Sequence, residues 1–355
     1  MVKYSYILRG DYMKIIHFAD LHIGSKFERL PEDKKQELNS KLRNAFTYII
    51  EFAKKNNINT IIMSGDIFDK NAVLIKDKKF FYDTIRLNPN IDFYYIRGNH
   101  DSSTKYNDDV SNLHTFEGIQ SYVKDNVRII GYELSDDNEV LYSYSPFTTD
   151  KFNIMMLHGD IFNSRDNNYI DLKRLEDKNI SYFALGHIHK RRNGLIGNGK
   201  YEYPGCVIGR GFDETGDKGF LVLDTDTNTT IFHKVPSFEF ETTEVNVTNK
   251  NEAEIKTLIS NFLDGKKAYL TEIKLTGKSD FEIDIQDLEN TFKSYRYYLT
   301  FKNESKLKLN YSFNENENSL RNMFINKVLE NTSLDEETRE EVINYGLSKL
   351  MKEEE

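Results

Sequence analysis

Several short apolar runs of this chain stop abruptly at residues that can bind metal ions, and this feature constrains the fold more than any other. Three of these runs, residues 14–20, 59–66 and 91–101, are predicted to be strands. Residues 33–57 and 76–87, which lie between them, carry apolar side chains at helical spacing. Strands that alternate with helices in this way predict βαβ units and a largely parallel sheet.

The spacing of the predicted elements changes after residue 120. Strands then follow more closely, with one helical stretch at 171–180; they are expected at 127–134, 140–146, 152–160 and 182–190. β structure continues to about residue 235. We therefore expect a fold of the α/β (α+β) class, in which a two-layer β core is flanked by helices.

The character of the sequence also divides the chain into segments. Residues 13–235 form the predicted core domain and follow an N-terminal extension of residues 1–12, which we expect to be dispensable. Residues 236–312 alternate between strand and helix patterns and predict a small α+β domain. Residues 313–355 combine a polar linker with two amphipathic helices.

Each C-terminal helix is predicted to carry one apolar face. The faces consist of Leu320, Met323, Phe324 and Val328 in the first helix and of Ile343, Leu347, Leu350 and Met351 in the second. A capping box from Ser333 to Glu336 is expected to start the second helix. Such faces suit either packing on the same chain or docking of a partner.

Composition excludes some classes of protein. The net charge of −9 excludes a globally basic nucleic-acid binder, so contacts with a polyanion have to be local or assisted by metal ions. No apolar run approaches the roughly 18–20 residues that span a bilayer, and no secretory signal is expected at the N-terminus. A single cysteine, Cys206, favours a reducing compartment, and we expect a cytoplasmic protein.

Candidate metal ligands stand at five places along the chain, most of them at the ends of predicted strands. They are Asp20 and His22, Asp66, Asn99, His158, and His187 and His189. Because ligands bind beyond the carboxyl ends of strands in α/β sheets, these groups can meet at one place. D-x-H and H-x-H each put two ligands on one side of an extended chain.

Two divalent cations about 3.5–4 Å apart can clamp both sides of an in-line displacement. Asp66 is the natural bridge between them. The first cation is expected on Asp20, His22 and His189, and the second on Asn99, His158 and His187. A bridging water, made acidic by both ions, would become the nucleophile.

His100 is left over from this set and suits a general acid that protonates the leaving oxygen. Asp101 is expected to orient its ring. The alternative is that the histidines are satisfied core residues and the Gly-Asp pairs are ordinary turns. Each motif alone is weak evidence for a metal site, but five such motifs in order along the chain favour a metal site over this alternative.

These motifs resemble those of the calcineurin-like metallophosphoesterases, whose pattern is D-x-H, G-D-x-x-D, G-N-H-D, H and G-H-x-H. The chain has DLH at 20–22, GDIFD at 65–69, GNHD at 98–101, LHGD at 157–160 and GHIH at 186–189. Within that superfamily it is most similar to the SbcD- and YhaO-type DNA-repair exonucleases, as the segment YPGCVIGRGFDETGDKGF at 203–220 indicates. The resemblance covers residues 13 to about 235 and is only architectural beyond.

The resemblance implies a two-metal-dependent DNA exonuclease or endonuclease subunit. Mn²⁺ is the usual ion in these nucleases, although the mixed nitrogen and oxygen ligands do not exclude Fe or Zn. Asp69 matches the second aspartate of G-D-x-x-D and is expected to orient a histidine or a water. The resemblance also implies a capping domain, a helical segment that binds a coiled-coil ABC-type ATPase subunit, and pairing into homodimers.

Four basic residues are weaker candidates for substrate binding. Lys190, Arg191 and Arg192 follow the H-x-H motif, where a polyanion would pass or where a loop is simply solvated. Arg97 precedes Gly98 where the family has a small or apolar residue, and a structural role is the stronger alternative. The face of Leu38, Leu42 and Phe46 is expected to pack on the sheet, with dimerisation as the alternative.

Two rival functions remain open at this point. A metallophosphatase or phosphodiesterase for a small molecule or a phosphoprotein would share the metal site, but small-molecule members tend to lack the domains after residue 235. A non-catalytic binding module would need neither a general acid nor a complete set of seven metal ligands, so their presence argues against this rival.

Overall fold

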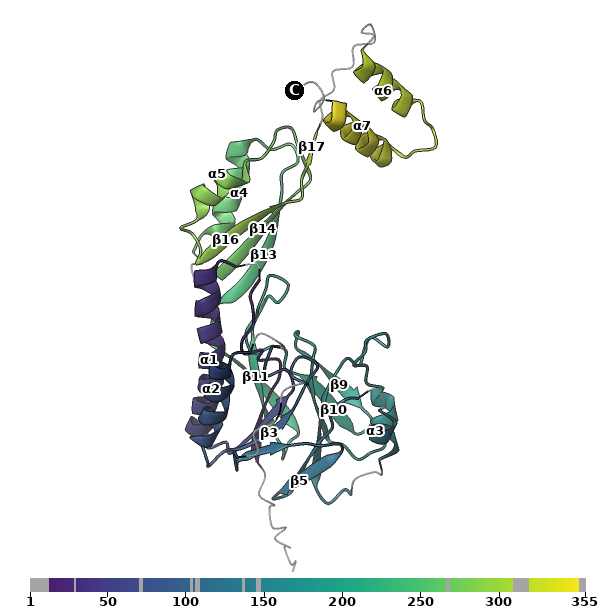
Figure 1. Ribbon diagram of the computed structural model, residues 1–355. Coiled ribbons are helices and arrows are strands. Elements are labelled where there is room, and N and C mark those ends of the chain that lie inside the picture. The colour runs from purple at the N-terminus through teal and green to yellow at the C-terminus, as the bar shows by residue number, and fades with distance from the viewer. Residues whose placement is uncertain are drawn as a thin grey trace, which may run out of the picture. The chain divides into compact units, whose positions relative to one another are not determined.

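The computed structural model describes residues 13–28, 30–69, 73–102, 105, 109–135, 138–144, 148–265, 269–308 and 319–350 (Figure 1). The predicted extension at 1–12 and most of the predicted linker lie outside these residues. The chain divides into two compact units, Met1–Thr242 with Ala268–Thr271 and Thr243–Lys267 with Glu272–Glu355. The predicted domain bounds stay a prediction.

Two six-stranded sheets form the first unit. The first sheet has the order β12-β11-β1-β2-β3-β4. Its strands are β1 (Lys14–Phe18), β2 (Thr60–Ser64), β3 (Asp92–Ile96), β4 (Leu113–Thr115), β11 (Gly219–Asp224) and β12 (Thr229–Lys234). Strands β1 to β4 are parallel, as the alternation of strands and helices predicts, and β11 joins β1 antiparallel.

The second sheet has the order β5-β6-β7-β8-β10-β9. Its strands are β5 (Gln120–Lys124), β6 (Val127–Gly131), β7 (Phe152–His158), β8 (Tyr182–Gly186), β9 (Arg192–Ile196) and β10 (Gly199–Tyr203). Strands β6, β7, β8 and β10 are parallel, and the outer strands β5 and β9 pair antiparallel. The predicted mixed two-layer β core is therefore confirmed.

A continuous apolar core joins the two sheets. Ile15, Ile62 and Ile96 of the first sheet pack against Ile154 and Met156 of the second, and all five are fully buried. Burial of a side chain of this size stabilises a fold by about 1.5–3 kcal/mol. The core thus holds the carboxyl ends of strands from both sheets at fixed positions.

Two helices, α1 (Glu32–Lys55) and α2 (Ile75–Arg86), lie along one side of the first unit (Figure 1). Leu38, Leu42 and Phe46 of α1 are fully buried. The ring of Phe46 stacks on Phe81 of α2 at 5.1 Å and meets Phe18 of β1 edge-on at 6.2 Å. This face packs within the unit, as expected, and is not available for dimerisation.

The predicted strand at 140–146 is wrong. The structure has a short helix, α3 (Glu139–Ser143), in which Leu141 is fully buried beside Leu172 and Leu175. Both edges of β7 are already paired with β6 and β8, so no place for a further strand is left there. The helix predicted at 171–180 shrinks to one 3₁₀ turn, η2 (Leu172–Leu175).

The second unit contains a small sheet with helices. The three-stranded sheet has the order β13-β14-β16, and a pair of two-residue strands accompanies it. The elements are β13 (Glu239–Asn246), α4 (Glu252–Leu263), β14 (Tyr269–Thr276), β15 (Lys278–Ser279), α5 (Ile285–Phe292), β16 (Tyr298–Asn303) and β17 (Lys306–Leu307). Ile259 of α4, Phe292 of α5 and Ile273 of β14 share one buried core.

Helices α6 (Leu320–Leu329) and α7 (Glu336–Leu350) form a hairpin. Its core consists of Ile325, Val328, Ile343 and Leu347, so the predicted face of α7 is confirmed at Ile343 and Leu347. Val328 and Phe324 of the predicted α6 face pack in this hairpin, whereas Leu320 and Met323 are 70% and 63% exposed, which leaves the docking alternative open at these two residues. The side chains of Leu350 and Met351 lie outside the described residues.

The predicted capping box at Ser333 is also wrong. The Asp335 carboxylate, directly before α7, accepts a hydrogen bond from the backbone N–H of Thr338 at 2.8 Å. The Ser333 hydroxyl instead donates to Asn331 at 2.6 Å. An acidic side chain one residue before the helix is a stronger cap than a serine further away.

Candidate metal centre

Five strand ends meet at one place in the first unit. Asp20 and His22 follow β1, Asp66 follows β2, Asn99 and His100 follow β3, His158 ends β7, and His187 and His189 follow β8. The carboxyl ends of neighbouring parallel strands share one edge of a sheet, and the two sheets bring their edges together. All seven predicted metal ligands therefore lie close to one another, although their coordination of metal stays a prediction.

One group of donors surrounds the imidazole of His22. Its Nε2 lies 3.2 Å from Nε2 of His189 and 3.7 Å from Oδ2 of Asp66. Nε2 of His189 lies 3.7 Å from Oδ1 of Asp20. Asp20, His22 and His189 thus lie at distances from which one cation could be held.

A second group surrounds the imidazole of His158. Its Nε2 lies 3.3 Å from Oδ2 of Asp66 and 3.2 Å from Oδ1 of Asn99. Nδ1 of His187 lies 3.1 Å from the same oxygen of Asn99. Oδ2 of Asp66 faces both groups, which is the arrangement that a bridging carboxylate requires.

The backbone of this site is strained. Asp20, His22, Asp66 and His187 have φ angles of 54°, 49°, 52° and 102°, in the left-handed region that non-glycine residues seldom adopt. Each such residue costs on the order of 1–3 kcal/mol and is kept only where the surrounding structure enforces it. Strain of this kind concentrates at functional sites.

Three strand-end glycines make room for the imidazole of His158. A Cβ atom at Gly98 would lie 2.3 Å from Oδ1 of Asp66 and 2.6 Å from Nε2 of His158. A Cβ atom at Gly65 or Gly186 would lie 2.3 or 2.8 Å from Nδ1 of the same ring. Any larger residue would push a predicted ligand out of place.

Burial and charge act in opposite directions on the titration of these groups. Burial alone would raise the pKa of Asp66, but the imidazoles of His158 and His22 hold that pKa well below its ordinary value. Burial lowers the pKa of His158, and the Asp66 carboxylate overcomes this and raises it to about 9. Burial raises the pKa of Asp20. The carboxylates thus attract positive charge strongly.

The hydrogen bonds of two imidazoles fit metal ligation. Nδ1 of His158 lies 2.8 Å from the carbonyl oxygen of Ser64, and Nδ1 of His189 lies 2.6 Å from Oε1 of Glu214. Because both acceptors require an N–H at Nδ1, Nε2 of each ring can offer its lone pair to a cation. Nδ1 of His22 is buried and has no hydrogen-bond partner among the described residues. This donor set fits divalent cations with a preference for mixed nitrogen and oxygen ligands.

The prediction that Asp101 orients His100 is wrong. Oδ2 of Asp101 accepts hydrogen bonds from the backbone N–H of Ile67 at 2.8 Å and the hydroxyl of Tyr95 at 2.5 Å. The turn after β3 directs this carboxylate into the core, where it joins two loops, and burial raises its pKa to about 6. Nδ1 of His100 lies 2.8 Å from Oδ1 of Asp69 instead.

Of the four basic candidates, Arg97 is engaged elsewhere. Its guanidinium makes hydrogen bonds of 3.0 and 2.6 Å to Oε2 of Glu133, which supports the structural alternative. Lys190, Arg191 and Arg192 are exposed. The guanidinium of Arg191 lies over the ring of Phe232 and that of Arg192 over the ring of Phe162, each at 4.7 Å.

Three residues that contact predicted site residues, Arg210, Glu214 and Ser25, are not among those predicted from the sequence. Glu214 accepts from Nδ1 of His189, and Nη2 of Arg210 donates to the same Glu214 oxygen at 3.1 Å. Arg210 and Glu214 lie in the segment at 203–220 that carries the family resemblance. The resemblance of that segment could have singled them out, but it does not predict what either side chain contacts. Ser25 donates to Oδ2 of Asp69 at 3.0 Å.

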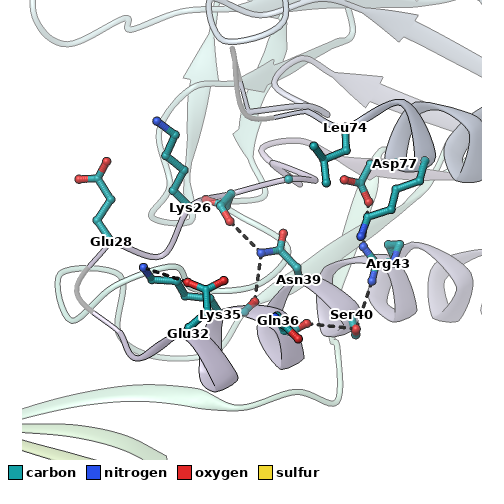
Figure 2. Close-up of a pocket in the computed structure, with 13 residues that line it drawn as sticks. Lys26, Glu28, Glu32, Lys35, Gln36, Asn39, Ser40, Arg43, Leu74 and Asp77 are labelled. Atoms are coloured by element: carbon teal, nitrogen blue, oxygen red, sulfur yellow. Dashed lines mark hydrogen bonds and ion pairs between the residues drawn. The ribbon is translucent and has the colours of Figure 1, made fainter.

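A cavity of about 940 Å³ lies beside the start of α1 and reaches Ser25 (Figure 2). Figure 2 shows charges of both signs along its wall, paired as Arg43 with Asp77 at 2.8 Å and Lys35 with Glu32 at 3.6 Å. Paired charges give no selective attraction for an anion. The metal centre therefore remains the candidate for chemistry.

Comparison with known proteins places this site in a family. The profile of the calcineurin-like phosphoesterase superfamily domain matches residues 13–228. The metallophosphoesterase YhaO of Bacillus subtilis is 30% identical over 251 residues, which cover 64% of this chain and 60% of YhaO.

Two archaeal proteins named DNA double-strand break repair protein Mre11 are also similar. That of Sulfolobus acidocaldarius is 28% identical over 53% of this chain and 52% of its own length. That of Methanocaldococcus jannaschii is 25% identical over 67% of this chain and 70% of its own length. The chain thus spans between about half and 70% of the lengths of these relatives.

No helix in the described part of the chain has both the length and the apolar composition that crossing a membrane requires.

The matched region, residues 13–228, contains all five strand-end motifs and covers more than half of the chain. This chain belongs to the calcineurin-like phosphoesterase superfamily.

Proposed function

We propose that this chain is a two-metal-dependent phosphodiesterase that acts on DNA, an SbcD-like exonuclease or endonuclease subunit. The observation that carries the proposal is the meeting of seven metal-ligand side chains at five strand ends, with Asp66 between two groups. The similarity to archaeal proteins named DNA double-strand break repair protein Mre11 supports DNA as the substrate. Mn²⁺ is the proposed ion.

Bound cations would supply positive charge for the phosphodiester and lower the pKa of the attacking water. Asp20, His22 and His189 would hold one ion, Asn99, His158 and His187 the other, and Asp66 both. Asp69 keeps the Nδ1 proton of His100 in place at 2.8 Å. Nε2 of His100 is then the atom that donates a proton to the leaving oxygen.

The partner proposal concerns α6 and α7. Leu320, Met323 and Tyr345 are 70%, 63% and 69% exposed on this hairpin. We propose that they meet a coiled-coil ABC-type ATPase subunit, which could also provide much of the DNA-binding surface, since the net charge of this chain is −9. The single cysteine supports a reducing, cytoplasmic location.

Degradation of end-labelled double-stranded DNA in the presence of Mn²⁺ tests the proposed function. The wild-type chain should cleave, and the His100→Ala variant should bind DNA but cleave at least about 10²-fold more slowly, as expected for a lost general acid. His233→Ala is the matched control, because His233 belongs to none of the five motifs and its ring packs on Phe52 and Phe220. A wild-type chain that hydrolyses a generic phosphodiester but leaves DNA intact would contradict the DNA proposal.

A further inference from the structure

Arg210, which lies between Gly209 and Gly211, reaches the candidate metal centre. The guanidinium of Arg210 has Nη2 at 3.2 Å from Nδ1 of His189 and Nη1 at 3.9 Å from Oδ2 of Asp69. Only 15% of this side chain is exposed. The cation therefore lies between a predicted ligand of the first ion and the carboxylate that holds His100.

The carboxylates near Arg210 do not explain its position fully. Asp69 already accepts from His100 at 2.8 Å and from Ser25 at 3.0 Å, and Glu214 already accepts from His189 at 2.6 Å. Nε of Arg210 is buried and has no partner among the described residues. The guanidinium already pairs with Glu214 at 3.1 Å, but a buried N–H without an acceptor is costly, so a further acceptor that reaches Nε would stabilise this arginine.

Phosphate is the anion that this geometry suits. The planar fork of a guanidinium offers parallel N–H donors that match two oxygens of a phosphate group. Arg210 and His100 both face Asp69, so a phosphate held by Arg210 would lie beside the proposed acid. The fork is fixed by Glu214, which accepts from the backbone N–H of Arg210 at 2.8 Å and from Nη2 at 3.1 Å.

We propose that Arg210 is a catalytic residue that binds non-bridging phosphate oxygens of the substrate, and that Glu214 is a positioning residue that holds both Arg210 and His189. This inference rests on the proposed phosphodiesterase function. It adds one positive charge of the protein itself to the charges of the two proposed metal ions.

Binding of inorganic phosphate to the Mn²⁺-loaded chain, measured by calorimetry, tests the proposal directly. Arg210→Gln should raise the dissociation constant of phosphate at least about tenfold, as expected for a lost charge-assisted bidentate contact. Arg210→Lys should restore part of the affinity, since it keeps the charge but loses the fork. The control is Arg174→Gln, which removes an equally bidentate arginine from an exposed pair with Glu139.

Kinetics with bis(p-nitrophenyl) phosphate separates this inference from the proposed function. Arg210→Gln should lower kcat/KM about 10²-fold at saturating Mn²⁺, as for a lost donor to transition-state charge, while half-saturation by Mn²⁺ stays unchanged. Glu214→Gln should weaken phosphate binding as well. Because Glu214 also holds His189, this variant should in addition raise the Mn²⁺ concentration for half-saturation, which Arg210→Gln does not.

Two outcomes overturn different claims. Unchanged phosphate affinity in Arg210→Gln, with weaker Mn²⁺ binding, would mean that Arg210 only holds neighbouring side chains together, and the inference would fail. A wild-type chain that binds Mn²⁺ and phosphate through Arg210 but hydrolyses no phosphodiester would instead end the proposed function and leave Arg210 as an anion-binding residue.

Discussion

The metal centre has a buried floor and an exposed rim, and the two are built differently. The floor, which we define as Asp20, Asp66 and His158, is at most 4% exposed and is enclosed by three glycines and a strained backbone. The rim, which we define as Lys190, Arg191 and Arg192, is exposed, and its two arginines rest on aromatic rings. The fold tolerates little change in the floor, whereas rim residues can adapt or be replaced.

The largest effect is expected from Asp66→Asn in the floor. A neutral side chain between the two donor groups removes the charge that holds both proposed ions. Metal ions contribute several kcal/mol to such reactions, so Mn²⁺-dependent phosphodiesterase activity should fall at least about 10³-fold. Activity and Mn²⁺ titration measure this, and Asp92→Asn, at the start of β3, is a control outside the centre. Near wild-type activity would remove Asp66 from its proposed role.

A smaller effect is expected from Gly98→Ala. The new Cβ atom would lie 2.3 Å from Asp66 and 2.6 Å from His158, so one of them has to move. Displacement of a catalytic group by about 1 Å can cost about 10²-fold in rate, and activity assays should show a loss of this size. Gly118→Ala is the control: its φ of 68° makes the alanine costly for stability, but the added Cβ meets no atom within 4 Å and displaces no predicted ligand. Equal activity losses in both variants would contradict the proposed crowding.

The next prediction concerns how the free energy of unfolding depends on pH through the buried residue His17. His17 of β1 is fully buried between Tyr182 and Ser64. Burial lowers the pKa of His17 to about 3, below its ordinary value of 6.5. In the unfolded chain the imidazole of His17 is therefore protonated as the pH falls through 6.5, whereas in the folded chain it is protonated only near pH 3.

Stability from this group is complete above pH 6.5 and declines as the pH falls toward 3. Between pH 7 and pH 5 it should decline by about 2 kcal/mol. Urea unfolding of the wild type and of His17→Phe at both pH values measures the difference. The variant should lose less stability over this interval, and an equal loss in both proteins would show that His17 is protonated in the folded state.

The smallest effect is expected at the rim. Lys190→Gln, Arg191→Gln and Arg192→Gln should each weaken DNA binding less than about tenfold, and the difference should shrink at high salt, since exposed charges are screened. Fluorescence anisotropy at 50 and 300 mM salt measures this, with Arg86→Gln on α2 as the control. A rim variant that abolishes cleavage at all salt concentrations would erase the distinction between floor and rim.

The sequence predicts the floor better than the surrounding network, and the reason is physical. Asp20, Asp66 and His158 stand at the ends of apolar runs, and a strand period fixes where those ends lie. Asp101 follows His100 directly in the sequence, and Asp69 belongs to the G-D-x-x-D motif, so either carboxylate could reach the ring. The turn after β3 directs Asp101 into the core, and Asp69 contacts His100. No periodicity encodes that turn.

Arg210 and Glu214 show the same limit at longer range. They are 21 and 25 residues from His189, in a segment without regular structure, and only the folded loop places them on that histidine. The predicted strand at 140–146 failed because its apolar pattern fits a strand, while the sheet has no free edge there. Local patterns predict elements, and packing decides how they are used.

The proposed chemistry depends on two divalent ions that share Asp66. Anomalous diffraction at the manganese absorption edge, on crystals of the chain grown with Mn²⁺, tests it most directly. We expect two anomalous peaks about 3.5–4 Å apart, with Asp66 between them. One peak should lie near Asp20, His22 and His189, and the other near Asn99, His158 and His187. A single peak, or peaks away from Asp66, would contradict the two-metal account.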